Sequence, residues 1–310
     1  MPLDVALENK TLVRQLVEEL ANQHRPEAWQ KYSAPHFKHH FAFAGISDDL
    51  MGIQQISQRL LEAFPDVHTE VQLLIAEGDW VVERAIATAT HLGPLLDIAP
   101  THQKVTWAAT HCYRIQEGKI VAYFPQVRFE RIIQQLRNPA FKAYQPKKTA
   151  LVRIASQVIK GMQCILPALK VTQSTQEEIN RAIVRTYIES FKNKQRYWVF
   201  PKLYATQQFR HHFNFEGLSN TLGTFVSVGM EFLTGFPDVQ VEIIALIAEG
   251  EYVVELNRVQ ATHQGKYFGI TATHRTVYWR EAHIYRLANG RIVENWPLVN
   301  FESILQQITI

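Results

Sequence analysis

The sequence predicts an α+β protein built from two tandem domains. In each half, segments with a helical pattern of apolar residues come first and strand-like segments follow, which is an α+β order. The halves also repeat one another: when each residue from 36 to 136 is aligned with the residue 172 positions later, no gap is needed and 44 of the 101 positions are identical. We therefore expect a first domain at 1–137, a connector with its own helix at 138–175 and a second domain at 176–310.

Composition and charge exclude several classes of protein. With 310 residues and 46% hydrophobic content, the chain is long enough to bury two cores. Its 32 basic and 29 acidic residues are mixed along the sequence, which argues against a nucleic-acid partner. No apolar run reaches the roughly 20 residues that cross a bilayer, so no membrane span is expected. Two cysteines and an N-terminal stretch without an apolar core indicate the cytoplasm rather than secretion.

The elements follow from local patterns. Apolar residues at helical spacing predict a helix over 7–24, a short helical piece around Trp29 and another helix over 53–61, with Pro65 just beyond its end. Segments 67–78 and 80–92 read as strands. The second half repeats this order and opens with a helix over 177–191. The connector places Leu151, Ile154, Val158 and Ile159 at helical spacing; we expect this helix to pack on a domain, and its basic residues leave a membrane-surface role open.

The stretches 101–136 and 273–308 are the most informative part of each half. In both, an alternating run rich in Val, Trp, Tyr and His leads to Gly-Lys/Arg-Ile-Val, which predicts two strands joined by a tight turn and a short closing helix. If the first turn centres on Glu117 and Gly118, His111 faces Phe124 and Trp107 faces Arg128. By strand alternation these four residues share one face, as do Trp279, His283, Trp296 and Asn300 in the second copy. We interpret this face as a pocket wall, although the aromatic residues also fit a plain core.

The repeated motifs resemble the SnoaL-like polyketide cyclase family, within the nuclear transport factor 2-like superfamily. The resemblance rests on FPDV, IAEG followed by Asp or Glu, Thr-His-x-Gly, Tyr-Arg-x-x-x-Gly-Lys/Arg-Ile-Val and a closing Gln-Gln pair, over roughly 100 residues of each half. It implies a cone-shaped barrel in which a curved antiparallel sheet wraps around helices and encloses an apolar pocket. It further implies an intramolecular aldol closure without metal or organic cofactor, and two domains that pack as a pseudo-dimer as separate chains do in the family.

Two family positions are altered in this chain. The family's acid/base aspartate lies four residues after the Trp of the hairpin's second strand, which is Arg128 in the first half and Asn300 in the second. An arginine stays protonated and an amide does not titrate, so neither is a general base at neutral pH. The family's Pro-Thr-Gly before the hairpin has also become Pro-Thr-His at His102 and Ala-Thr-His at His274.

Histidines are the remaining candidates for proton transfer. Five of them recur in both halves; the second set is His211, His212, His263, His274 and His283, each matching one of His39, His40, His91, His102 and His111. We place His111 and His283 on the pocket wall, with a buried structural imidazole as the alternative. Of each adjacent pair we choose His40 and His212 for the pocket, and we expect His91 and His263 to cap strand ends. A metal site is possible in principle, but no His-x-His or His-x3-His pair lies within one element, so none is predicted.

The halves differ around these histidines. The second has Glu281 where the first has Ala109, and Glu294 where the first has Ala122. A carboxylate two residues from His283 on one strand face could tune that imidazole, which favours the second domain as the chemical site. Glu83 and Glu255 occur in both halves and are expected to face away from the pocket.

The prediction is a cofactor-independent cyclase or isomerase acting on a small apolar, carbonyl-bearing ligand of polyketide or terpenoid type. His283, assisted by Glu281 and Asn300, would move the proton, and Asn300 and Tyr285 could donate to an enolate oxygen. The first domain would be structural or would bind an anionic group through Arg128. The predicted substrate-binding residues are Trp279, Tyr285, Trp296, His212, Trp107, His111, Phe124, Arg128 and His40. The alternative is a ligand-binding or scaffold protein that has lost the family aspartate.

Overall fold

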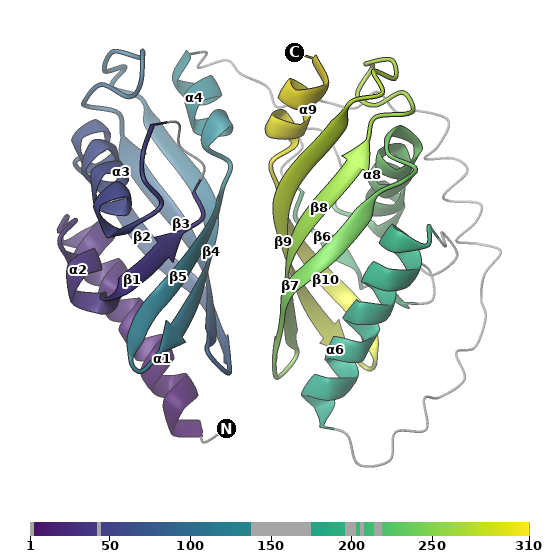
Figure 1. Ribbon diagram of the computed structural model, residues 1–310, viewed down its shortest axis with the longest axis horizontal. Coiled ribbons are helices and arrows are strands. Elements are labelled where there is room, and N and C mark those ends of the chain that lie inside the picture. The colour runs from purple at the N-terminus through teal and green to yellow at the C-terminus, as the bar shows by residue number, and fades with distance from the viewer. Residues whose placement is uncertain are drawn as a thin grey trace. The chain divides into compact units, whose positions relative to one another are not determined.

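The chain forms two compact units, Met1–Phe141 and Lys142–Ile310 (Figure 1). The structure, a computed structural model, describes residues 3–41, 45–137, 175–195, 203–204, 208–213 and 219–309. The predicted connector helix lies outside these residues. The pairing of the units as a pseudo-dimer stays a prediction. None of the helices in the described ranges combines the length and apolar character that a membrane span requires.

The first unit contains the predicted helices. These are α1 (Leu3–Val17), which continues as a π-helical turn η1 (Glu18–Asn22), then α2 (Ala28–Tyr32), α3 (Leu50–Ala63) and α4 (Phe129–Arg137). The start of α3 is fixed by Asp49, whose carboxylate accepts a hydrogen bond from the Gly52 backbone N–H at 3.0 Å. Val13 and Leu16 on α1 are fully buried, as the helical spacing of apolar residues predicts.

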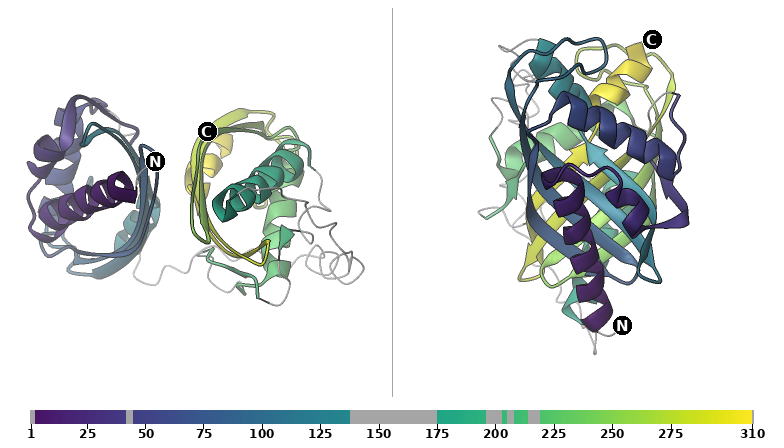
Figure 2. Two further views of the ribbon diagram at one scale, coloured as in Figure 1. Left: turned by 90° about the horizontal axis from the view of Figure 1, so that it is seen from below. Right: turned by 90° about the vertical axis from the view of Figure 1, so that its left-hand side faces the viewer.

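The sheet of the first unit has five strands in the order β1-β5-β4-β3-β2. Their bounds are β1 (Ser33–His39), β2 (His68–Glu77), β3 (Trp80–Thr90), β4 (Lys104–Gln116) and β5 (Lys119–Val127). All neighbours are antiparallel except β1 and β5, which run parallel. The sequence did not predict β1. Seen end on, the sheet curls around α1 (Figure 2).

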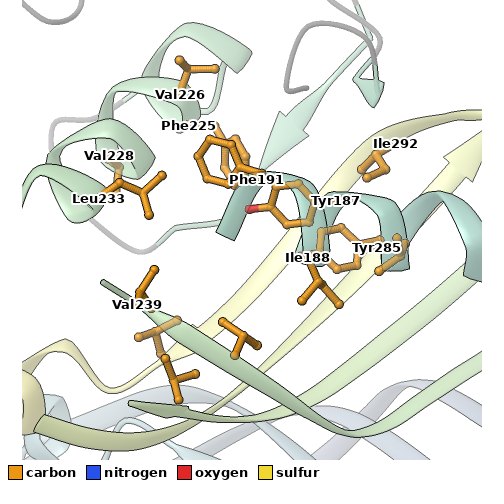
Figure 3. Packing of buried hydrophobic residues seen from close by; sticks show 14 of the residues in the cluster. Tyr187, Ile188, Phe191, Phe225, Val226, Val228, Leu233, Val239, Tyr285 and Ile292 are labelled. Carbon is orange, nitrogen blue, oxygen red and sulfur yellow. The ribbon is translucent and has the colours of Figure 1, made fainter. Parts of the chain in front are cut away.

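The second unit repeats this plan. Its helices are α6 (Gln176–Tyr187), continued by the π-helical turn η2 (Ile188–Asn193), α8 (Leu222–Gly235) and α9 (Phe301–Thr309). Its sheet has the order β6-β10-β9-β8-β7, with β6 (Arg210–His211), β7 (Gln240–Glu249), β8 (Tyr252–Thr262), β9 (Thr276–Ala288) and β10 (Arg291–Val299). Thr175 and Glu178 form a capping box at the start of α6. Tyr187 and Phe191 pack with Phe225, Val239 and their neighbours into one core between helices and sheet (Figure 3).

The hairpin turns are as predicted, but the register beyond them is not. Glu117 and Gly118 both have positive φ, the conformation of a tight hairpin turn. One extra residue, Val121, then interrupts the β4–β5 ladder between the pairs Ile115–Ile120 and Arg114–Ala122. A one-residue shift moves every following side chain to the other face. His111 therefore lies opposite Pro125, and the predicted pairing of His111 with Phe124 is wrong.

The same bulge occurs in the second copy. It lies at Val293, so His283 lies opposite Pro297, whereas Trp296 lies opposite Ile284. The predicted pairing of His283 with Trp296 is therefore also wrong.

Candidate functional site

The first unit has an apolar cavity of about 170 Å³ that is lined by its sheet and its helices. An apolar cavity of about 150 Å³ is large enough to bind benzene, so a single ring fits this space. Polar groups are few in its wall; the side chains of the sheet and helices that carry them are Trp29, Ser57, Thr69, Trp107, His111 and Tyr123. The cavity thus has the character of a small-ligand site, apolar with a few polar groups.

His111 is held in this wall by a buried carboxylate. Its Nδ1 lies 3.4 Å from Oε2 of Glu83, directly across the β3–β4 ladder, and Glu83 is 1% exposed. The same oxygen accepts a hydrogen bond of 2.8 Å from the hydroxyl of Tyr113. Burial, followed by the neighbouring charge of Glu83, raises the pKa of Tyr113 well above its ordinary value, so this tyrosine remains a donor. The carboxylate thereby favours the tautomer with hydrogen on Nδ1 and leaves Nε2 of His111 as the basic atom.

Trp107 adds a hydrogen-bond donor to the same wall. In the second unit the equivalent indole, Trp279, donates its Nε1–H to Oε2 of Glu281 at 3.0 Å. The first unit has Ala109 at the position of Glu281, so this acceptor is missing. The Trp107 indole N–H is therefore suited to a ligand oxygen in the cavity.

The second unit has a buried cluster of charged groups at the corresponding place. The Lys192 ammonium, in η2, lies 2.8 Å from Oε1 of Glu255 and 2.6 Å from Oε1 of Glu281. Nε2 of His283 lies 3.5 Å from Oε1 of Glu281 and 3.8 Å from Oε1 of Glu255. Asn257 donates to Glu255 at 3.1 Å. All five side chains are buried, so the two carboxylates depend on the single ammonium for neutralisation.

The protonation states of this cluster follow from its geometry. Burial alone would lower the pKa of Lys192, but the charges of Glu255 and Glu281 overcome that effect and raise it. Burial would raise the pKa of Glu281, but the charge of Lys192 and the contact with His283 hold it well below 4.5. Lysine and glutamate are therefore both ionised at neutral pH. The cavity beside them measures about 60 Å³, too small for a ring.

The structure brings only part of the predicted set together. His283, Glu281 and Trp279 share the inner face of the second sheet, and His111 and Trp107 line the first cavity. Tyr285 lies on the same inner face as His283, with which its ring stacks at 5.9 Å, and it is fully buried.

Four predicted residues lie on the other face of their sheets. His40 stacks on Phe124 with ring centroids 4.1 Å apart, and Phe124 lies opposite Cys112 rather than His111. In the second unit His212 stacks on Trp296 at 4.6 Å. None of the four lines the cavities described above. For Phe124 and Trp296 the prediction of a pocket-facing side chain is wrong because the bulges at Val121 and Val293 reverse the parity of the second hairpin strand. His40 and His212 come directly after β1 and β6 and stack on these two outer rings, so the choice of these histidines for the pocket is wrong as well.

Glu294 lies two residues before Trp296 on β10 and therefore on the same face of the sheet. It accepts hydrogen bonds from His212 at 3.1 Å and from Arg286 at 2.7 Å, so it does not join His283. Asn300 caps α9, where its Oδ1 accepts the Ser303 N–H at 2.9 Å. Asn300 and Arg128 follow the last residues of β10 and β5, and neither lines its cavity.

Three important residues were missed or misplaced from the sequence. Glu83 and Glu255 were expected to face away from the pocket, but both are buried on the inner face beside His111 and His283. Lys192 was not considered at all. It follows Ile188 by four residues and so continues the apolar stripe of its helix, which is the signal that could have found it.

The recurring His91 and His263 serve the loop before the hairpin, close to the strand-end role that was expected. Nδ1 of His91 accepts the backbone N–H of Thr101 at 3.1 Å, and Nδ1 of His263 accepts that of Thr273 at 3.3 Å. Burial lowers the pKa of both imidazoles, which keeps these nitrogens as acceptors. The residues that follow Thr101 and Thr273 are His102 and His274, and they have φ of 56° and 55°. Histidine therefore occupies a left-handed position that suits glycine better.

Both halves of the chain match the same family of known proteins. Residues 11–136 and 181–308 each match the family described as SnoaL-like polyketide cyclase. Among curated proteins nothing matches the chain.

Solved structures similar to one unit include AclR from Streptomyces galilaeus, described as a hydroxylase: identity is 23%, coverage 51% of this chain and 96% of that one, and TM-score 0.40. A protein described as a SnoaL-like polyketide cyclase from Jannaschia sp. CCS1 has 21% identity, coverage of 45% and 96%, and TM-score 0.40. A protein described as a polyketide cyclase from Acidithiobacillus ferrooxidans has 25% identity, coverage of 43% and 96%, and TM-score 0.39.

Proposed function

The chain belongs to the SnoaL-like polyketide cyclase family, and from this premise we propose that its first domain is a cofactor-independent cyclase or isomerase. Its substrate would be a small, mostly apolar, carbonyl-bearing compound of polyketide or terpenoid type. The observation that carries this proposal is His111, which lines an apolar cavity of about 170 Å³ and is backed by the buried carboxylate of Glu83. A histidine held by a carboxylate is a common arrangement for moving a proton near neutral pH.

The proposed step is an enolisation. Nε2 of His111 removes a proton from the carbon next to the ligand carbonyl, and the resulting imidazolium is stabilised by Glu83 at 3.4 Å. The Trp107 N–H donates to the carbonyl oxygen as it becomes an enolate. The enolate then attacks a second carbonyl, which gives a ring, or, in a ligand whose enolate is conjugated with a C=C bond, takes the proton at the far end of the conjugated system, which gives an isomer. His111 returns its proton to the product in either case, so no atom is gained or lost.

This assignment moves the proton transfer from His283, the base predicted from the sequence, to His111. At the family's aspartate position the chain has Arg128 and Asn300, so the histidine takes over the proton transfer in our proposal. The set His283, Glu281 and Asn300 is the weaker candidate, because Glu281 is committed to Lys192 and Asn300 to the start of α9. The 60 Å³ cavity beside His283 also gives a ring no room.

Deuterium exchange tests the proposal without knowledge of the natural substrate. Cyclopentanone and cyclohexanone are incubated with the full chain in D2O, and incorporation at the carbons next to the carbonyl is followed by NMR. The wild type should accelerate exchange, and His111→Gln should remove at least about 100-fold of that acceleration, the contribution typical of a general base. His283→Gln is the matched control from the second unit and should exchange like the wild type. Equal rates for the wild type and His111→Gln would refute the role of His111.

The alternative is a binding protein without catalysis. It is supported by the loss of the family aspartate in both halves. The same samples distinguish the two: saturable ketone binding with no exchange above the buffer rate would establish the binding function.

A further inference from the structure

The two units have equivalent positions that can be compared one to one. Asn22 exchanges two hydrogen bonds with the backbone of Thr69, at 2.8 and 3.2 Å. Asn193 makes the same pair with Val241, at 2.7 and 3.1 Å. Thr69 and Val241 are 172 residues apart, so the two asparagines occupy the same place and the residues before them, Ala21 and Lys192, do as well.

Three small residues of the first cavity are replaced by large polar ones in the second unit. Ala21, Ala85 and Ala109 all line the first cavity. Their counterparts are Lys192, Asn257 and Glu281, and these are joined to one another and to Glu255 by hydrogen bonds of 2.6–3.5 Å. His111 and Glu83, in contrast, keep their counterparts His283 and Glu255. The cavity volume falls from about 170 to about 60 Å³ between the two units.

The cluster also leaves no vacancy for a metal ion. Glu255, Glu281 and His283 present ligand atoms within 4.8 Å of one another, a spacing that a metal could bridge. The Lys192 ammonium, however, already lies between the two carboxylates at 2.8 and 2.6 Å. A divalent ion at this place would have to displace the Lys192 ammonium. The displaced ammonium would then be a buried charge without its two carboxylate partners.

We propose that Lys192, Asn257 and Glu281 close the second domain to ligands, so that, of the two cavities that the described residues form beside His111 and His283, only the first binds a ligand. The lysine acts as an internal cation at the position where Ala21 lines the first cavity. This inference deepens the proposed function and rests on the first cavity as its site. The inference concerns ligand binding, whereas the proposed function concerns turnover, so one experiment can contradict either of them without the other.

Ligand stoichiometry tests the inference. Fluorobenzene, which matches the size of the first cavity, is titrated into the full chain and followed by ¹⁹F NMR. One molecule per chain is expected, and Ala109→Phe, which fills the first cavity, should abolish binding. Two molecules per chain, no binding at all, or one molecule that persists in Ala109→Phe would overturn the inference. Failure of ketone exchange with intact binding would count only against the proposed catalysis.

A second variant tests the three positions directly. Lys192→Ala/Asn257→Ala/Glu281→Ala restores the three alanines of the first cavity beside His283 and Glu255, and it should bind two molecules of fluorobenzene per chain. A folded triple variant that still binds one would contradict the assignment of these residues. If circular dichroism shows that the variant is unfolded, the wild-type stoichiometry and Ala109→Phe still decide. One equivalent of Zn²⁺ bound to the wild type and lost in His283→Gln would overturn the role of Lys192 as the internal cation.

Discussion

Lys192→Ala is the perturbation with the largest effect that the structure allows us to work out. The change leaves the carboxylates of Glu255 and Glu281 buried without a cation, and both had an oxygen within 2.8 Å of the ammonium. Removing one partner of a buried ion pair destabilises a protein by about 3–5 kcal/mol. With a urea m-value of about 2 kcal/mol/M, the unfolding midpoint of the second unit should fall by about 2 M.

The assay is urea unfolding with matched variants. Lys194→Ala, two residues away and exposed, should stay within about 0.5 kcal/mol of the wild type. Lys192→Ala/Glu281→Ala copies the alanines of the first unit and should recover about 2 kcal/mol relative to Lys192→Ala, because one uncompensated carboxylate is gone. The reasoning is refuted if Lys192→Ala is as stable as Lys194→Ala, or if the double variant is less stable than the sum of its single variants.

Three further predictions concern the loop before β4, the pH dependence of stability and the hydrogen-bond donor of Trp107. At His102, whose φ is 56°, Val should destabilise the first unit by about 1–2 kcal/mol relative to Gly, which thermal unfolding of the two variants would measure. Burial lowers the pKa of His211 to about 4; its neutral form is favoured in the fold, so the stability it contributes is complete above about pH 6.5 and is lost as the pH falls towards 4, by about 3 kcal/mol in total. His211→Gln should remove that part of the slope in unfolding measured across this pH range, and an unchanged slope would contradict the assignment. Trp107→Phe should lower the rate of ketone exchange by about 10-fold or more with little change in ketone affinity, and a pure loss of affinity would argue against a donor role.

Most of the fold could be predicted because it is encoded locally and twice. Apolar spacing identified α1, α3 and the strands β2 to β5, and the duplication transferred each of them to the second half. The turn at Glu117 and Gly118 was equally local. β1 was missed because it is short and pairs in parallel with β5, a strand about 85 residues later in the sequence.

The candidate site could be predicted only in part. Strand parity placed His111 on the same face as Trp107 and, in the other unit, His283 on the same face as Trp279, because each pair lies on a single uninterrupted strand. It failed across the hairpin, since a single extra residue at Val121 reverses the face of everything after it. A bulge of this kind depends on how the sheet curves and has no reliable mark in the sequence.

The buried charges were the largest omission. Lys192 lies on a helix and its partners lie on two strands more than 60 residues away. Nothing local distinguishes it from the exposed Lys194 except its place in the helical stripe. The contrast between the halves at Ala21, Ala85 and Ala109 becomes meaningful only once the fold shows that these positions face one cavity.

The central claim is that the first domain binds a carbonyl compound between His111 and Trp107. A crystal structure of the full chain soaked with cyclohexanone tests it most directly. We predict the ring in the first cavity, with its oxygen about 3 Å from Nε1 of Trp107 and a neighbouring carbon about 3.5 Å from Nε2 of His111. A ketone bound in the second domain, or a first cavity that remains without ketone at saturating concentration, would contradict the account.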